Sequence, residues 1–216
     1  MYRILDISFR HKLAHLGSCL TMFPILERIY ATKAPGDLVV LSAGHAGVAQ
    51  YVALEQLGTG IDAEQLVHDF GVHPSRDPSR GLHVSSGSLG SAFLVAVGLA
   101  FAKRSRTVFC LLSDGECAEG TVWEGLAFAK RHDLRNLAVH VNANGFSAYD
   151  AVDREDLKAR LLSFCPWAVV HFTTNPEVPH MRGLEGHYHV LKTEAEVAAL
   201  AENLVGSSTD VEKIKR

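Results

Sequence analysis

Four short apolar runs, each followed by a segment with helical periodicity, constrain the fold of this chain most strongly. The runs cover residues 38–41, 107–112, 137–141 and 167–172. Because they are apolar throughout, we expect strands that are buried on both faces, as in parallel sheets. Helical patterns occupy residues 21–30, 46–57, 63–70, 91–103, 121–132, 157–164 and 194–204. This alternation predicts an α/β fold of three layers, in which helices cover both faces of a mostly parallel sheet.

The length of the chain is consistent with a single domain. Its 216 residues, 47% of them hydrophobic, can bury a substantial core. We expect one domain over residues 1–205. Residues 206–216 are small, polar and charged, which predicts a flexible tail.

Charge and hydropathy disfavour two classes of partner. With 21 Lys and Arg residues against 24 Asp and Glu residues, the chain presents no single-sign field for nucleic acid or for an anionic membrane. No apolar run approaches the roughly 20 residues that span a bilayer, and the charged N-terminal segment does not resemble a signal peptide. We therefore expect a cytoplasmic protein. Its four cysteines lack CxxC spacing and are expected to be reduced thiols.

Polar side chains follow two neighbouring strands of the predicted sheet. The run 107–112 leads into SDGECAEG at 113–120, and the next strand leads into NANGF at 142–146. A carboxylate at a strand end, with glycines that let backbone amides approach, is a common receptor for a metal-bound diphosphate. Asp114 and Asn144 are 144 − 114 = 30 residues apart, the length of one strand-helix-strand step. We expect both side chains at the carboxyl edge of the sheet, where ligands bind in such folds.

Residues 113–150 resemble the thiamine diphosphate motif of transketolases, in which a Gly-Asp-Gly start and a later Asn hold magnesium. The resemblance implies the thiamine diphosphate-binding fold and a diphosphate-binding (PP-type) domain. It also implies that thiamine diphosphate binds with Mg²⁺, or with Ca²⁺ or Mn²⁺ in its place. Asp114, Asn144 and the backbone carbonyl of Phe146 would be the metal ligands, with Gly115 and Glu116 beside the diphosphate. Three protein oxygens, two diphosphate oxygens and one water would complete an octahedral Mg²⁺ shell.

Four histidines lie at positions that resemble family motifs. His15, in the opening segment 3–30, would reach the substrate side of the thiazolium, and His73 would lie near the reacting carbon. His45, in GHA at 44–46, would contact the diphosphate. His187, in EGHY at 185–188, would contact the diphosphate and transfer protons. A lone loop histidine is more often a surface residue, and this alternative stays open most clearly for His187.

Three further positions carry implied roles. The sequence GLHVSSGSLG at 81–90 resembles an element that places the backbone of Gly87 and Leu89 against the aminopyrimidine. Glu119 resembles the family glutamate that meets the catalytic glutamate across the subunit interface, where it would relay or position charge; a surface Glu without a partner is the alternative. An alternative reading of His180, His187 and His189 is that these three histidines form a zinc centre. No Cys or carboxylate near them completes a familiar spacing of zinc ligands, which disfavours this alternative.

The resemblance also implies a partner chain. In this family a glutamate on a pyrimidine-binding domain starts ylid formation, and the present chain ends before such a domain. We therefore expect a separate pyrimidine-binding subunit, assembled with this chain as a heterotetramer. The reaction that this implies is transfer of a two-carbon ketol unit between sugars or sugar phosphates.

Two departures from the family pattern keep other functions open. Ser113 replaces the first Gly of the usual triplet, and HFTTN at 171–175 stands where the family has a Gly-Lys-Gly segment. The stretch 144–187 is shorter than in full family members by about one strand-helix unit. The alternatives are a decarboxylating enzyme of the 2-oxo acid dehydrogenase or deoxyxylulose phosphate synthase type and a non-catalytic regulatory subunit. The runs VWE at 122–124 and LRNL at 134–137 favour the transketolase group.

Overall fold

A four-stranded parallel sheet forms the centre of the molecule. The computed structural model of the chain describes residues 1–147, 150–176, 178, 181 and 183–207. The strands are β1 (Leu38–Leu41), β2 (Val108–Ser113), β3 (Leu137–Ala143) and β4 (Val169–Phe172), paired in the order β1-β2-β3-β4. All four predicted strands are present. Strand β3 runs two residues beyond the predicted end, which places Asn142 and Ala143 inside the sheet.

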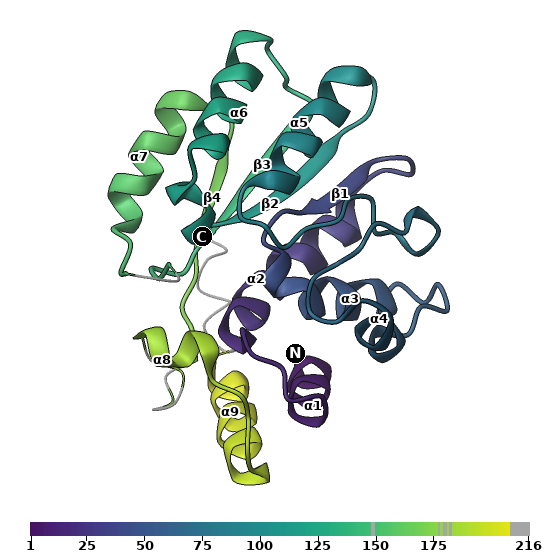
Figure 1. Cartoon of the computed structure of the whole chain (residues 1–216), viewed down its shortest axis with the longest axis vertical. Coiled ribbons are helices and arrows are strands. Elements are labelled where there is room, and N and C mark those ends of the chain that lie inside the picture. Colours follow the sequence, from purple (N-terminus) through teal and green to yellow (C-terminus); the bar gives the residue numbers. More distant parts are fainter. Residues whose placement is uncertain (148–149, 177, 179–180, 182, 208–216) are drawn as a thin grey trace.

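Helices cover the sheet on both sides. They are α1 (Tyr2–Arg10), α2 (Leu16–Thr32), α3 (Gly47–Glu55), α4 (Ala63–Phe70), α5 (Ser91–Ala102), α6 (Gly120–Arg131), α7 (Arg154–Phe164), α8 (Gly183–Tyr188) and α9 (Glu194–Ser207). Three short 3-10 turns, η1 (Gly44–Ala46), η2 (Pro78–Arg80) and η3 (Gly115–Ala118), lie in the loops. Figure 1 shows α5, α6 and α7 side by side over the sheet and α1 to α4 gathered apart from them. No helix in the described part of the chain is long and apolar enough to cross a membrane.

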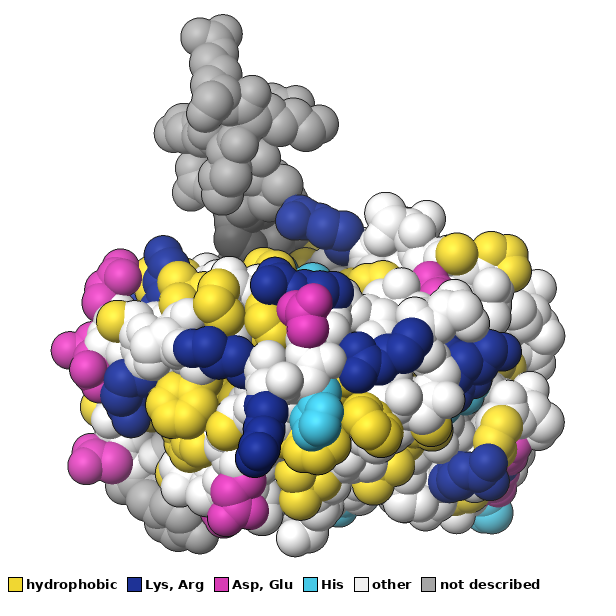
Figure 2. Space-filling view, turned by 90° about the horizontal axis from the view of Figure 1, so that it is seen from above, with side chains coloured by type: hydrophobic (Ala, Val, Ile, Leu, Met, Phe, Trp, Pro, Cys, Tyr) yellow, Lys and Arg dark blue, Asp and Glu magenta, His cyan; other side chains and the backbone are white. Residues whose placement is uncertain are grey.

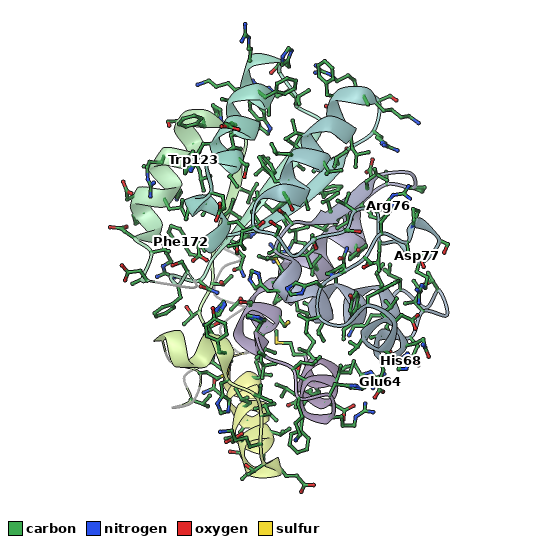
Figure 3. All side chains as sticks on the ribbon, in the orientation of Figure 1. Glu64, His68, Arg76, Asp77, Trp123 and Phe172 are labelled. Atoms are coloured by element: carbon green, nitrogen blue, oxygen red, sulfur yellow. The ribbon has the colours of Figure 1, made fainter. Side chains whose placement is uncertain are left out.

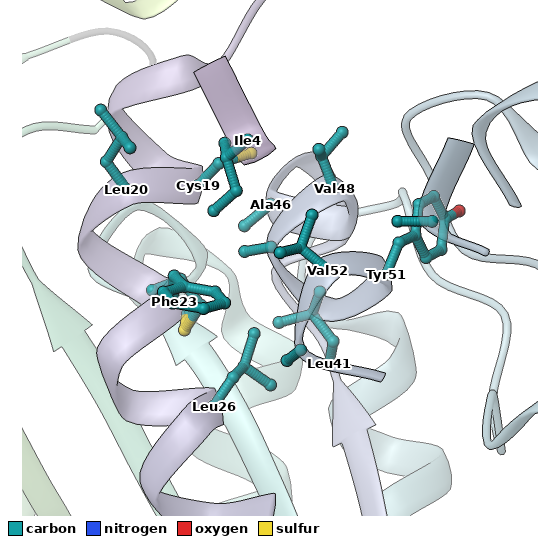
Figure 4. Close-up of a cluster of buried hydrophobic side chains, with 14 of the residues drawn as sticks. Ile4, Cys19, Leu20, Phe23, Leu26, Leu41, Ala46, Val48, Tyr51 and Val52 are labelled. Atoms are coloured by element: carbon teal, nitrogen blue, oxygen red, sulfur yellow. The ribbon is translucent and has the colours of Figure 1, made fainter. Parts of the chain in front are cut away.

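The two faces of the sheet pack into two separate cores, as expected for a three-layer fold. In β1, Val39 and Leu41 join the core beneath α1 to α4, whereas Val40 joins the core beneath α5, α6 and α7. The alternation follows from the period of two in a strand. Figure 4 shows part of the first core, where Phe23 of α2 and Val52 of α3 pack together. Full burial of side chains of this size stabilises the fold by roughly 1.5–3 kcal/mol each.

The N-terminal helix α1 is absent from the sequence prediction. Its Ile4 and Ile7, one turn apart, are fully buried, so its inner face is apolar although its outer face is charged. Arg3 fixes the helix to α3 through an ion pair with Glu55, at 3.1 Å between Nε and Oε2. The apolar residues of this segment do recur at helical spacing, so the signal for the helix was present in the sequence and was missed.

Several helix boundaries differ from the prediction, most of all the start of α2, the start of α7 at Arg154 rather than at residue 157, and the end of α9. Helix α2 begins at Leu16 rather than at residue 21, because His15 adopts a left-handed conformation (φ 63°) that starts the helix without a side-chain cap. Helix α9 continues to Ser207, two residues into the expected tail. The remainder of that tail, residues 208–216, lies outside the described residues.

A histidine pair joins β3 to β4 on the face covered by α2. The Nδ1 atom of His140 lies 2.9 Å from Nε2 of His171, and the two rings stack at 13° with their centroids 5.2 Å apart. Burial, followed by the charge of His171, lowers the pKa of His140 to about 4. Burial, followed by the charge of Arg28 on α2, lowers the pKa of His171. Both rings are therefore neutral at neutral pH.

This pair predicts a loss of stability in mild acid. The pKa of a histidine in an unfolded chain is about 6.5, above the folded value for His140, so the unfolded state binds more protons between about pH 6.5 and pH 4. The free energy of unfolding should fall as the pH falls through this window. We expect His140→Gln to reduce the difference between pH 7 and pH 5 by about 1 kcal/mol in urea unfolding. His68→Gln, at an exposed histidine of α4 (Figure 3), is the matched control; an equal change there would contradict the prediction.

Candidate functional site

A cavity of about 220 Å³ opens at the carboxyl ends of β2 and β3. Its walls come from the start of α2, from η1, from the loop before α5, from the ends of the two strands and from α8. The lining residues are His15, Ser18, Met22, His45, His73, Gly87, Leu89, Ser113, Asp114, Gly115, Asn142, Asn144, Phe146, Ser147, His187 and Tyr188. The structure thus brings most of the predicted site residues to one cavity. Glu116 and Glu119 do not line it.

The two oxygen-bearing side chains predicted to hold a metal lie at adjacent strand ends. The Oδ2 atom of Asp114 accepts a hydrogen bond from the backbone N–H of Gly145 at 2.7 Å, one residue beyond Asn144. Its Oδ1 atom accepts one from Gly115 N–H at 3.0 Å. The side-chain oxygen of Asn144 faces the same turn and accepts from the N–H of Phe146 at 3.0 Å. A carboxylate, an amide oxygen and nearby backbone carbonyls form a donor set that suits a hard cation such as Mg²⁺.

Asp114 is the single acidic side chain on the described lining. It is 3% exposed, and this burial raises the pKa of its carboxyl group to about 6, against the opposing effect of the amide hydrogen bonds. No Lys or Arg is among the described residues that line the cavity. A bound divalent cation would offset the desolvation of this carboxylate. The residues present therefore fit a metal ion at this position.

Three histidine rings gather on the wall opposite the strand ends. The ring centroid of His15 lies 4.7 Å from that of His187 and 5.5 Å from that of His45, and the centroids of His45 and His187 are 6.0 Å apart. The backbone N–H of His15 donates to the carbonyl of His187 at 3.2 Å, which ties α8 to the start of α2. His187, for which a surface position was the open alternative, is thus part of the cluster.

The cluster is uncharged at neutral pH. Burial is the main cause that lowers the pKa of His15 to about 4 and that of His45 to about 3, and it also lowers the pKa of His187. Neutral imidazoles present one donor and one acceptor nitrogen each. Nδ1 of His15 is buried and has no hydrogen-bond partner in the described part of the chain, so it is available to a ligand.

The zinc alternative gains no support from the described residues, among which no three His, Cys, Asp or Glu side chains form a metal-binding group. His180 lies outside those residues, His187 lines the cavity, and Nε2 of His189 lies 3.4 Å from a carboxylate oxygen of Glu196.

Two glycine-containing loops form the wall beside His73. A Cβ atom added to Gly44 would lie 2.6 Å from the backbone nitrogen of Gly87, so a side chain at Gly44 would force the loops apart. Gly87 has φ +141°, which strains an L residue, and a Cβ atom there would lie 3.3 Å from the ring of His73. Because Gly44 and Gly87 have no side chains, the backbones of the two loops can pack closely together where Gly87 and Leu89 border the cavity.

Glu116 lies behind the wall of the cavity and connects three loops. Its Oε1 atom accepts hydrogen bonds from Ser42 Oγ at 2.6 Å and from the backbone N–H of Gly90 at 2.9 Å. Its Oε2 atom accepts from the N–H of Ser113 at 3.0 Å. The side chain is fully buried, and this desolvation raises its pKa although the hydrogen bonds lower it. We interpret Glu116 as a residue that positions the loops; its carboxylate does not reach the cavity.

Glu119 also lies outside the cavity, at the N-cap of α6. It is partly exposed, and a Cβ atom added to Gly90 would lie 3.3 Å from its own Cβ. The residue therefore sits beside the start of α5, at the surface. This place is compatible with the interface role that the resemblance implies, which remains a prediction.

Sequence reasoning missed several lining residues, of which Asn142 is the most firmly held. Its amide donates to Thr21 Oγ1 at 2.9 Å and its Oδ1 accepts from Thr173 Oγ1 at 2.5 Å. The signal was available, because Asn142 precedes Asn144 by two positions and so shares its side of the strand. Ser18 and Met22 follow His15 by three and seven residues, the spacing of one helix face. The others that were missed are Ser113, Ser147 and Tyr188.

A family model described as "Transketolase, thiamine diphosphate binding domain" matches residues 14–183. The chain belongs to the transketolase family. Its membership agrees with the resemblance that residues 113–150 show to this family.

Individual relatives in this family cover the chain to different extents. Transketolase-like protein 2 from Bos taurus is 40% identical over 118 residues, which are 50% of this chain and 19% of that protein. One subunit of the apulose-4-phosphate transketolase from Phocaeicola vulgatus is 28% identical over 160 residues, 66% of this chain and 57% of that protein. The chain thus matches about a fifth of the length of the first of these relatives and little more than half of the second.

Solved transketolase structures share the fold. The transketolase from Leishmania mexicana superposes with a TM-score of 0.75 at 20% identity, over 94% of this chain and 40% of that chain. The transketolase from Campylobacter jejuni gives a TM-score of 0.70 at 21% identity, over 94% of this chain and 41% of that chain. At this identity the agreement supports the three-layer α/β transketolase-type fold.

The Glu116 hydrogen bonds predict a graded loss of stability on substitution. Glu116→Ala leaves two buried N–H groups and a hydroxyl without their acceptor, and we expect the free energy of unfolding to fall by about 3 kcal/mol. Glu116→Gln keeps the shape of the side chain but turns its NH₂ group toward one of the three donors. Its loss of stability should therefore be smaller than that of Glu116→Ala. Urea unfolding measures both, with Glu202→Ala at an exposed position of α9 as the control. Equal stability of Glu116→Ala and Glu202→Ala would contradict the assigned role.

Proposed function

We propose that this chain is the diphosphate-binding subunit of a two-component, thiamine diphosphate-dependent enzyme of the transketolase type, located in the cytoplasm. The enzyme would transfer a two-carbon ketol unit between sugars or sugar phosphates. The observation that carries the proposal is the meeting of Asp114 and Asn144 at neighbouring strand ends, in a cavity that four histidines also line. The likeness to a protein named as one subunit of a transketolase supports the division into two chains.

The electrostatics of the cavity favour a ligand that arrives with a cation. A diphosphate group carries negative charge, and the described lining offers it a carboxylate and no Lys or Arg. A divalent ion held by Asp114, Asn144 and the carbonyl of Phe146 would reverse the local charge. Mg²⁺ is the proposed ion, with Ca²⁺ or Mn²⁺ as substitutes.

The other lining residues have distinct proposed roles. His45 and His187, as neutral imidazoles, would donate hydrogen bonds to diphosphate oxygens, with Gly115 adding a backbone amide. The backbone of Gly87 and Leu89 would receive the aminopyrimidine. When bound, thiamine diphosphate supplies an electron sink for cleavage and formation of carbon-carbon bonds.

Proton transfer would fall to His15 and His73 on the substrate side, with His187 as a further candidate. Nδ1 of His15 has no hydrogen-bond partner among the described residues. Because burial lowers the pKa of His15 and of His187, both rings are unprotonated at neutral pH and act as proton acceptors of modest strength. Each ring can hold a substrate hydroxyl by accepting its hydrogen bond.

A second chain would complete the site. Glu119 lies at the surface beside the start of α5, next to the loop that borders the cavity. There it would meet a glutamate of a pyrimidine-binding subunit, and two copies of each chain would form a heterotetramer. A small-molecule sugar is the proposed substrate.

The metal assignment predicts the behaviour of one substitution. Asp114→Ala removes the only carboxylate among the proposed ligands, so the Mg²⁺-dependent affinity for thiamine diphosphate should fall by at least about a hundredfold. Titration calorimetry of the chain with and without Mg²⁺ measures this. Asp156→Ala, at an exposed position of α7, should bind as the unchanged chain does. Unchanged affinity in Asp114→Ala would refute the assignment of the ligand.

The activity itself requires the companion chain. We expect a mixture of this chain, a pyrimidine-binding chain encoded beside it, thiamine diphosphate and Mg²⁺ to transfer a ketol unit from a simple ketose phosphate to an aldose. Turnover of pyruvate in place of a ketose phosphate would favour a decarboxylating enzyme. Tight binding of the cofactor without turnover of any donor would favour a regulatory subunit.

A further inference from the structure

A hairpin in the loop between α4 and α5 places two basic side chains next to each other. Asp77 and Leu82 form an antiparallel bridge and exchange two backbone hydrogen bonds, at 2.8 and 3.0 Å. The residues beside such a bridge form a pair without hydrogen bonds, in which the two side chains are close and share a face. That pair is Arg76 and His83, on the face opposite to Leu82. Figure 3 labels Arg76 and Asp77 on this loop, at the edge of the molecule beside β1.

Two more cations lie near the hairpin, where β1 and β2 begin. Lys33 follows α2, and Arg106 precedes β2. Burial is the main cause that lowers the pKa of His83. The further causes are the charges of Lys33, Arg106 and Arg76, so these three cations lie near the ring. Figure 2 views the molecule from the side where the strands begin, and it shows Lys and Arg side chains across that side. We call Lys33, Arg76, His83 and Arg106 the β1 basic cluster.

The positive charge of this cluster is not cancelled by ion pairs. None of its four members forms an ion pair within the described part of the chain. Asp37, which also precedes β1, uses its two carboxylate oxygens to accept backbone N–H groups at 2.9 Å each. Asp77 pairs with Arg80 at 2.7 Å, on the other face of the hairpin. The three permanent cations of the cluster therefore exceed the one carboxylate of Asp37.

The cluster also has hydrogen-bond donors without acceptors. Nε of Arg106 is buried and has no partner among the described residues. A buried N–H group without an acceptor costs free energy, which an oxygen of a ligand would recover. The guanidinium of Arg76 and the ring of His83 form no hydrogen bond with described residues either. Nζ of Lys33 donates to two backbone carbonyls, at 3.4 and 3.5 Å, which leaves one of its three donors free.

We propose that the β1 basic cluster binds a phosphate group, either as the free ion or as the phosphomonoester of a small molecule. The donors come from three places, which are the hairpin, the end of α2 and the start of β2. A phosphate group presents oxygens in several directions and so can accept from all three, and a guanidinium fork matches two of these oxygens at once. The neutral ring of His83 adds one N–H donor.

The proposed phosphate site is separate from the cavity but connected to it by one loop. No member of the cluster lines the cavity, so the inference stands without the proposed function. The loop that carries Arg76 and His83 also carries the cavity residues His73 and Gly87, one before and one after the hairpin. A phosphate bound to the cluster would therefore hold the segment that forms one wall of the cavity.

Titration of the histidine rings by NMR tests the inference on the full chain. A bound anion favours the protonated ring, so about 20 mM inorganic phosphate should raise the pKa of His83 by about one unit, relative to sodium chloride of equal ionic strength. The exposed His68 of α4 is the internal control, and its pKa should stay the same. Equal shifts of the two rings would overturn the inference, because they would report a general effect of the buffer.

Substitutions identify the residues that bind the ion. Arg76→Gln and Arg106→Gln should each raise the dissociation constant for phosphate at least about tenfold, because each removes a charged fork. Arg160→Gln, at an exposed arginine of α7, is the matched control and should bind as the unchanged chain does. Circular dichroism shows whether each variant keeps its fold. Equal effects of Arg76→Gln and Arg160→Gln would contradict the site.

A comparison of ligands identifies the source of the phosphate group. Glycerol phosphate that shifts His83 as strongly as inorganic phosphate would assign the site to a phosphomonoester. A shift with inorganic phosphate alone would assign it to the free ion. A shift with a single-stranded DNA oligonucleotide, but with neither small ligand, would overturn the inference and assign the cluster to nucleic acid.

Discussion

The buried carboxylate of Glu116 is the interaction on which the cavity most depends. It holds Ser42 after β1, Gly90 at the start of α5 and Ser113 at the end of β2 by hydrogen bonds of 2.6–3.0 Å. Gly90 and Ser113 are next in sequence to the cavity residues Leu89 and Asp114, and Ser42 lies three residues before His45. An ionisable group without exposed surface is costly unless it is fully bonded, and here three donors compensate for the desolvation. The arrangement of the loops follows from this one group.

Much of the fold could be predicted, because local signals agree with it. Helix α4 begins and ends where the sequence predicts: Asp62 accepts hydrogen bonds from the N–H groups of Glu64 and Gln65, and Gly71 ends the helix at φ +70°. The strands are buried apolar runs, and the spacing of Asp114 and Asn144 placed both at one edge of the sheet. These predictions needed only the period of each element and the rule that parallel strands end together.

The remaining features depend on contacts between distant parts of the chain. The sequence places Asp114 and Glu116 two residues apart in one glycine-containing motif, and no local pattern shows that the η3 turn directs one into the cavity and the other behind its wall. The left-handed backbone of His15 is likewise fixed by a distant contact, the carbonyl of His187. Local preference decides which elements form, whereas such contacts decide what each side chain faces.

The cavity is nearly neutral apart from Asp114, and this has a chemical consequence. The chain has twelve histidines, but desolvation lowers the pKa of His15 and His45, so these two rings carry no positive charge at neutral pH. No Lys or Arg is among the described lining residues to supply a positive charge in their place. An anion without a metal would meet a carboxylate and uncharged donors, which disfavours its binding. An anion chelated to a divalent cation meets a ligand for the cation and donors for its own oxygens. On the proposed function, the same burial that keeps the histidines free to accept protons would also favour a metal-bound anion, so that specificity for the ligand and readiness for proton transfer would have one physical cause.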